Sequence, residues 1–221
     1  MSSREAARWI RFLRNYGPIP TNDNMYDETI QRALRRHRID PLVLPAQFLD
    51  PLLGNFRAET PCSEILTGTA GDGKTYHCRE AWLALGGSDA DWNTGRKVQR
   101  MALGQRELVV VKDLSELRAD ESAELLEKMA TDVAMPDPER VYLIAANHGQ
   151  LLEKLKAAPS SPELKTMIET VEELLVTGTN PNAAVRLNVR DLSQAPASLM
   201  LASVINAMMS HAGWDQCGAC S

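Results

Sequence analysis

The segment from Gly68 to Thr75 reads GTAGDGKT and satisfies the pattern G-x-x-x-x-G-K-[ST]. Its glycines permit positive φ, so successive backbone N–H groups can turn inward toward an anion. A lysine and a hydroxyl at the last two positions suit nucleotide phosphates and Mg²⁺, respectively. The alternative is a chance glycine-rich turn before a helix. We predict an ATP-binding loop made of Gly68, Thr69, Ala70, Gly71, Asp72, Gly73, Lys74, Thr75 and Tyr76.

A magnesium ion at such a loop needs a carboxylate from a neighbouring strand. Asp113 ends the apolar run ELVVVKD, which is typical of a buried strand. We therefore predict that Thr75 and Asp113 share Mg²⁺. The alternative role for Asp113 is to cap the helix that follows.

Hydrolysis requires further groups beside Lys74. Leu114 follows Asp113, and the nearest carboxylate is Glu116, which is either catalytic or an ordinary first-turn glutamate. Asn147 ends the apolar run VYLIAAN, so it is expected at the nucleotide edge of a parallel sheet. Its alternative role is in the turn that it forms with His148 and Gly149.

Strands that alternate with helices must position these residues. Apolar runs predict strands at 63–67, 107–113, 141–147 and 184–189, whereas 98–104 fits either a strand or a helix. Helices are predicted at 74–85, 119–133, 149–157, 161–176 and 196–211. This alternation predicts a three-layer α/β/α fold with a parallel sheet.

The first 58 residues are predicted to form a helical and loop extension, with helices at 3–15 and 27–38. Residues 1–40 hold eight arginines and five acidic residues, which indicates either a solvated basic face or a contact with nucleic acid or a partner. We expect the ATPase core at 59–212 and the start of a zinc-binding segment at 213–221.

The composition of the 221-residue chain is that of a folded protein, with 44% hydrophobic residues. A net charge of −5 argues against general nucleic-acid binding by the whole chain, and 5% aromatic residues argue against base stacking. The sequence contains no run of about 18 apolar residues, so we predict no membrane span. Four scattered cysteines favour a reducing, cytoplasmic compartment.

Cys217 and Cys220 have the C-x-x-C spacing of half a zinc site. A complete Zn²⁺ site would need ligands from a longer chain. The alternatives are a frayed tail and a redox pair.

The motifs at Gly68–Thr75, Asp113 and Asn147 together resemble the P-loop ATPases of the AAA+ and STAND-like groups. The phrases TGTAGDGKT, VVVKDLSE and IAANHGQL resemble more closely the ATPases of DNA phosphorothioation-dependent restriction systems, the DptF type, and related bacterial anti-phage ATPases. The resemblance covers roughly 63–220 and includes the terminal cysteine pair.

The resemblance implies a parallel sheet of order 5-1-4-3-2 and a water-orienting role for Asn147. It also implies an arginine finger, for which Arg186 and Arg190 are the nearest candidates, and Arg190 is preferred. The alternative for Arg190 is a surface residue paired with Asp191. The implied function is ATP hydrolysis that serves DNA restriction, with DNA, a nuclease or a helicase as partner, and homo-oligomers. The alternatives are a helicase-loader or transposition-type regulatory ATPase and a nucleotide-binding module of low turnover. A small-molecule kinase is disfavoured because no lid of arginines follows the core.

Overall fold

A computed structural model describes residues 3–14, 27–42, 44, 46–158, 161–194 and 197–217 of the chain. The chain divides into two compact units, one made of Met1–Pro45 with Ala195–Ser221 and the other of Ala46–Gln194. The expected boundaries at 58/59 and 212/213 stay predictions.

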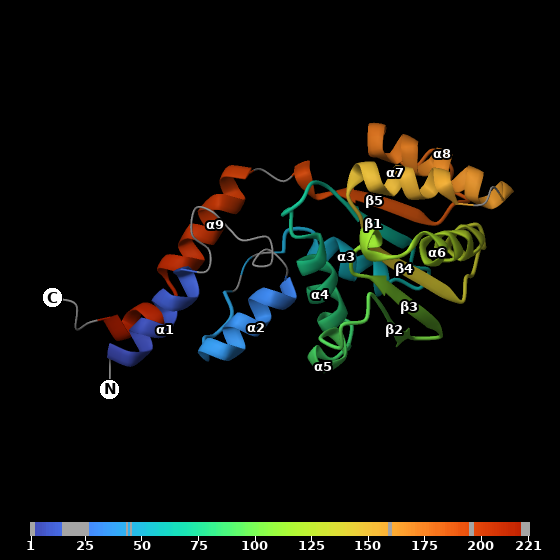
Figure 1. The fold of residues 1–221 in the computed structure, drawn as a ribbon. Helices are drawn as coiled ribbons and strands as arrows, with labels where there is room; N and C mark the ends of the chain where they lie inside the picture. Colours follow the sequence, from blue (N-terminus) through green and yellow to red (C-terminus); the bar gives the residue numbers. More distant parts are fainter. Residues whose placement is uncertain are drawn as a thin grey trace. The chain divides into compact units, whose positions relative to one another are not determined.

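The Ala46–Gln194 unit contains a five-stranded sheet with helices on both sides (Figure 1). Its strands are β1 (Ser63–Thr67), β2 (Val98–Leu103), β3 (Arg106–Val111), β4 (Arg140–Ala145) and β5 (Leu187–Asp191). Its helices are α3 (Leu49–Phe56), α4 (Lys74–Ala84), α5 (Asp89–Trp92), α6 (Ala119–Val133), α7 (His148–Ala157) and α8 (Pro162–Thr177), with short 3₁₀ turns η3 (Leu114–Glu116) and η4 (Leu192–Gln194).

The sheet has the order β2-β3-β4-β1-β5. Strand β1 pairs in parallel with β4 and β5, and β3 pairs in parallel with β4, but β2 is antiparallel to β3. Read from the other edge this is the order 5-1-4-3-2, but the predicted P-loop sheet, parallel throughout, is wrong because β2 is antiparallel to β3.

A hairpin is the reason for this correction. Leu103 and Arg106 are paired across the two-residue turn Gly104-Gln105, so the chain reverses directly into β3 without a crossover helix. Gly104 has φ of +62°, a conformation that two-residue hairpin turns favour and glycine adopts without strain. The segment 98–104, which fitted a strand or a helix, is thus the antiparallel edge strand.

Alternate residues of the sheet build two separate cores, as the period of a strand requires. Val109, Val111 and Ile144 contact the side chains of α6, α7 and α8. Val110 and Leu143 belong to the opposite core with α3, α4 and α5. These buried runs of β-branched and apolar residues explain why the central strands form, because both of their faces are covered.

The unit formed by Met1–Pro45 and Ala195–Ser221 contains α1 (Ser3–Leu13), α2 (Asp27–His37), α9 (Ala197–Met209) and the 3₁₀ segment η5 (Ala212–Cys217). Its small core centres on Trp9, Phe12 and Leu34, all of them buried. The ring of Trp9 stacks on His211 at 4.0 Å and meets Trp214 edge-on at 6.1 Å. Helix α1 therefore packs against the segment that follows α9.

Within the described residues, every helix is too short or too polar to cross a membrane.

Candidate nucleotide-phosphate site

The parallel strands bring the predicted site residues to one edge of the sheet. The register pairs Leu66 with Ala145 and Thr67 with Asp191, so β1, β4 and β5 end together. Val111 of β3 is level with Ile144 of β4. The segments that follow these strands begin at Gly68, Lys112, Ala146 and Leu192, and they carry the loop, Asp113 and Asn147. The carboxyl edge of the sheet is therefore the candidate site.

The loop between β1 and α4 has the backbone conformation that its glycines predict. Gly68, Gly71 and Gly73 have φ of +146°, +89° and +79°. Gly73 is also the N-cap of α4, and its lack of a side chain leaves the helix end without a side-chain cap. A β-carbon at Gly68 would come within 3.3 Å of the backbone nitrogen of Ser193, so the start of the loop packs closely against the segment after β5.

Lys74 folds back over the loop. Its ammonium donates a hydrogen bond of 2.5 Å to the carbonyl oxygen of Thr69, and the residue is only 9% exposed. Burial lowers the pKa of Lys74, and the negative charges of Asp72, Asp113 and Asp191 oppose that shift. A single cation thus lies in the field of three carboxylates.

Asp72 places its carboxylate inside the loop. Its Oδ2 accepts hydrogen bonds from the backbone N–H of Thr69 at 2.5 Å and from the Thr69 hydroxyl at 3.0 Å. An amide of the loop therefore already points at an anion, as predicted for a phosphate-binding nest. The flanking residues Thr69, Ala70 and Gly71 are exposed.

Thr75 bonds to the backbone next to Asp113, just after β3. The Thr75 hydroxyl donates to the carbonyl oxygen of Lys112 at 3.2 Å. Oδ1 of Asp113 accepts from the Ser115 N–H at 2.8 Å, so Asp113 caps η3, which was its alternative role. That bond uses one carboxylate oxygen, and the other makes no hydrogen bond within the described part of the chain. Thr75 therefore contacts the segment that carries Asp113, and the role of the two residues as magnesium ligands stays a prediction.

Asn147 lies directly after β4, where Ala146 N–H donates to the Leu66 carbonyl at 3.0 Å. Asn147 is the N-cap residue of α7, but its side chain does not cap the helix. Its amide donates instead to Gln150 Oε1 at a long 3.3 Å. Asn147 is half-buried, and its side chain is only weakly held.

Glu116 is exposed at the end of η3. Its backbone carbonyl accepts a hydrogen bond from Lys97, and the described contacts do not bring its carboxylate to the loop.

Arg190 is paired with Glu64 rather than with the loop. Its Nε and an Nη each donate at 2.9 Å to the Glu64 carboxylate, which is fully buried and also accepts from Asn188 at 3.0 Å. Burial raises the pKa of Glu64, and the Arg190 charge opposes that shift. Arg186 donates to the Thr60 carbonyl. Neither candidate arginine finger faces the loop.

Two residues of this edge were missed by sequence reasoning. Asp191 ends β5, and its Oδ1 accepts from the Ser193 N–H at 3.0 Å and hydroxyl at 2.6 Å. His148 Nε2 lies 3.5 Å from Asp191 Oδ2. Burial acts to raise the pKa of Asp191, but the Ser193 hydrogen bonds and the His148 charge outweigh it and lower the pKa. A carboxylate directly after an apolar strand was the available signal.

His77 supports the loop from inside the protein. It is 3% exposed, and its Nδ1 lies 2.9 Å from the Gly73 carbonyl oxygen. That geometry assigns the proton to Nδ1, because a carbonyl can only accept. Burial lowers the pKa of His77, and the bond to Gly73 opposes the shift. The Tyr76 ring meets the His77 ring edge-on at 5.9 Å.

The expected cysteine pair cannot be placed. Cys220 lies outside the described residues, and for Cys217 only the backbone, in η5, is described. The described part of the chain contains no group of three or more His, Cys, Asp or Glu side chains arranged to hold a metal ion.

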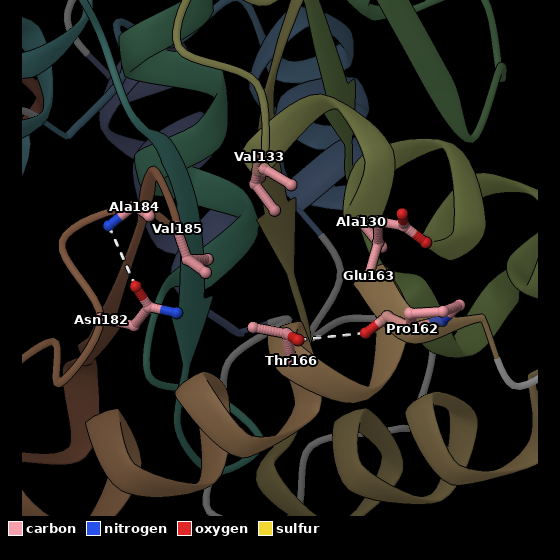
Figure 2. A pocket seen from close by; sticks show the side chains of 9 residues that line it. Ala130, Val133, Pro162, Glu163, Thr166, Asn182, Ala184 and Val185 are labelled. Atoms are coloured by element: carbon pink, nitrogen blue, oxygen red, sulfur yellow. Dashed lines mark hydrogen bonds between the residues drawn. The ribbon is translucent and has the colours of Figure 1, made fainter.

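The Ala46–Gln194 unit also has a separate pocket of about 210 Å³, and Figure 2 shows the side chains that line it. Ala130 and Val133 of α6, Pro162 and Thr166 of α8, and the 182–185 loop line it. Arg186, just after that loop, bonds to the Val133 carbonyl and to Ser63 at the start of β1. The pocket is therefore at the opposite end of the strands from the phosphate loop.

Comparison with known proteins gives no match: no family model, curated protein or solved structure is similar to the chain.

Proposed function

We propose that the chain binds ATP with Mg²⁺ at the Gly68–Thr75 loop and hydrolyses it. One observation carries the proposal: the Thr69 amide of the loop already binds an anion, the Asp72 carboxylate, and the Lys74 ammonium bonds to the carbonyl oxygen of the same residue. A phosphate oxygen has the same hydrogen-bonding requirements as that carboxylate oxygen. The loop therefore suits a terminal phosphate chemically.

The residues around the loop have separable roles. Lys74 would turn from the Thr69 carbonyl to the β- and γ-phosphates. The Thr75 hydroxyl and the Asp113 carboxylate would hold Mg²⁺, since hard oxygen ligands are the ones that it prefers. When bound, the ion supplies positive charge that offsets the phosphates and the neighbouring carboxylates.

In this proposal, water attacks the nucleotide on the side of the loop that is next to β4. The weakly held Asn147 amide can turn to orient the attacking water, and Glu116 is retained as the candidate base. A nucleotide-binding module of low turnover is the second candidate. The exposed position of Glu116 and the pairing of Arg190 with Glu64 favour that second candidate.

We further propose that nucleotide turnover serves DNA restriction or anti-phage defence, with DNA or a nuclease or helicase as partner, in the cytoplasm. The support is the resemblance of TGTAGDGKT, VVVKDLSE and IAANHGQL to ATPases of that kind. A loader-type regulatory ATPase is the alternative, and self-association of the chain remains part of the proposal.

The test is binding of a fluorescent ATP analogue and release of phosphate, with and without DNA. Lys74→Ala should weaken binding about 10- to 100-fold, the value of a lost charged hydrogen bond. Lys128→Ala is the matched control, because Lys128 is an exposed lysine paired with Glu124 on α6. Circular dichroism checks that each variant folds. Binding that is equal in wild type and the folded Lys74 variant would refute the proposal. Binding without turnover, unchanged by Glu116→Gln, would favour the second candidate.

A further inference from the structure

The phosphate loop contains an anion of its own. Oδ2 of Asp72 accepts from both the N–H and the hydroxyl of Thr69, and it lies 2.5 Å from where a β-carbon on Gly68 would be. Only a glycine at position 68 leaves room for this carboxylate. The loop sequence thus allows Asp72 to fold into the space that the loop encloses.

The same arrangement holds Lys74 away from an incoming phosphate. The Thr69 N–H binds Asp72, while the Thr69 carbonyl accepts from the Lys74 ammonium at 2.5 Å. The backbone of Thr69 therefore binds both the Asp72 carboxylate and the Lys74 ammonium. Asp72 must leave the Thr69 N–H before a phosphate oxygen can accept from it, and Lys74 must leave the Thr69 carbonyl before its ammonium can donate to phosphate.

We propose that Asp72 is a specificity-determining residue whose carboxylate competes with phosphate for the loop and makes binding depend on the Mg²⁺-complexed form of the nucleotide. The inference rests on the proposed nucleotide-binding function. Phosphate must displace a charge-assisted hydrogen bond, which is roughly twice as strong as a neutral one. Metal-free ATP also meets the repulsion of Asp72, and bound Mg²⁺ offsets that repulsion.

The surrounding charges strengthen this preference. Asp113 and Asp191 add their negative charges to that of Asp72 in the electrostatic surroundings of Lys74. A metal-free triphosphate would add about four negative charges to this region. Removal of the Asp72 charge should therefore help metal-free nucleotide more than the magnesium complex.

The experiment is a titration of full-length wild type, Asp72→Asn and Asp72→Ala with a fluorescent ATP analogue, in Mg²⁺ and in EDTA. Asp72→Asn keeps the shape of the side chain and removes its charge, and Asp72→Ala removes both. We expect both variants to tighten metal-free binding at least about tenfold, the alanine variant as much as or more than the asparagine variant, with a smaller gain in Mg²⁺. Inorganic pyrophosphate should also compete better in both variants.

Asp137→Asn is the matched control, because Asp137 is 83% exposed in an ion pair with Arg106 and the variant changes the net charge equally. Its affinities should equal those of wild type. Lys74→Ala, alone and combined with Asp72→Asn, tests whether binding uses the loop.

The outcomes separate the two proposals. If wild type binds in a Lys74-dependent way but the Asp72 variants bind metal-free nucleotide no more tightly, the role of Asp72 is overturned and the proposed function stands. If every protein fails to bind, or binding ignores Lys74, the proposed function fails and the role of Asp72 fails with it. An equal gain from Asp137→Asn would assign the effect to net charge and overturn the specific role.

Discussion

The hydroxyl of Thr75, in the first turn of α4, donates a hydrogen bond of 3.2 Å to the carbonyl oxygen of Lys112, the residue before Asp113. This bond joins the helix after the phosphate loop to the end of β3. It holds Thr75 against the residue that precedes Asp113, although the two segments are far apart in the sequence.

Thr75→Ala should therefore weaken magnesium-dependent nucleotide binding about tenfold, whereas Thr75→Ser should remain near wild type because it keeps the hydroxyl. The measurement is a Mg²⁺ titration at fixed fluorescent ATP analogue. Thr131→Ala is the control, since Thr131 is an exposed threonine on α6 that bonds only within its helix. Equal behaviour of the alanine and serine variants would count against a ligand role for the hydroxyl.

Asn147→Ala should lower ATP turnover about 100-fold, the usual effect of losing one hydrogen-bond donor to a reacting group. Nucleotide affinity should stay nearly constant, because the proposed role of the amide is to orient water. Stability should change little, since the amide does not cap α7 and its bond to Gln150 is long. Gln150→Ala, which removes the same bond from the other side, serves as the control in parallel phosphate-release and unfolding assays.

Arg190→Ala should destabilise the fold by about 3 kcal/mol, because it leaves the fully buried Glu64 carboxylate without its charged partner. Glu64→Gln in the same chain should recover part of the loss, since a neutral amide is cheaper to bury. Denaturant unfolding measures the free energy of unfolding of Arg190→Ala alone and combined with Glu64→Gln. Arg100→Ala, which breaks an exposed pair with Glu107, should cost less than about 1 kcal/mol. Unchanged stability with lost turnover would instead place Arg190 in catalysis.

The buried His77 predicts a pH dependence of stability. Its pKa is lowered from the ordinary value of 6.5, so the unfolded chain binds a proton that the folded chain resists. Stability should be complete above about pH 6.5 and fall as the pH decreases from there toward the folded-state pKa.

Unfolding free energies measured across that range should show a shallower decline in His77→Gln, which cannot titrate. His37→Gln, which replaces a half-exposed histidine of α2, serves as the control substitution. A parallel decline in His77→Gln and wild type would assign the acid sensitivity to other groups.

Gly87→Ala should destabilise the protein by about 1–3 kcal/mol through overpacking. A β-carbon there would lie 2.2 Å from the Trp82 ring, which is buried and bonded to the Ser88 carbonyl at 3.0 Å. Gly149→Ala meets open space in α7 and should be neutral or stabilise by up to about 1 kcal/mol. Thermal unfolding compares the Gly87→Ala and Gly149→Ala variants. Equal melting temperatures of the two variants would contradict the close contact with Trp82.

Local sequence signals predicted the backbone conformation of the loop and the central strands. The glycine spacing between Gly68 and Gly73 specifies the loop conformation, and uninterrupted apolar runs mark strands buried on both faces. Edge strand β2 could not be recognised as easily, because its buried residue is the polar Gln99 and its other residues are half-buried or exposed, so no apolar run marks it. The turn at Gly104 was the available signal for a hairpin, and without it the sheet was predicted to be parallel.

The remaining features depend on contacts between distant residues. Glu64 and Arg190 are 126 positions apart, so their pairing follows from the alignment of β1 with β5 and not from a local pattern. The inward turn of Asp72 depends on the space left by Gly68. The sequence alone does not show in which direction an aspartate of a glycine-rich loop turns its side chain.

The packing of Trp9 against His211 and Trp214 makes Ala46–Gln194 an insertion into the other compact unit. A proteolytic nick at the junction near residue 45 should therefore not release α1, because its aromatic contacts still fasten it to the segment after α9. Conversely, the inserted unit has both of its cores within 46–194 and can be excised as a minimal fragment for crystallisation or isotope labelling.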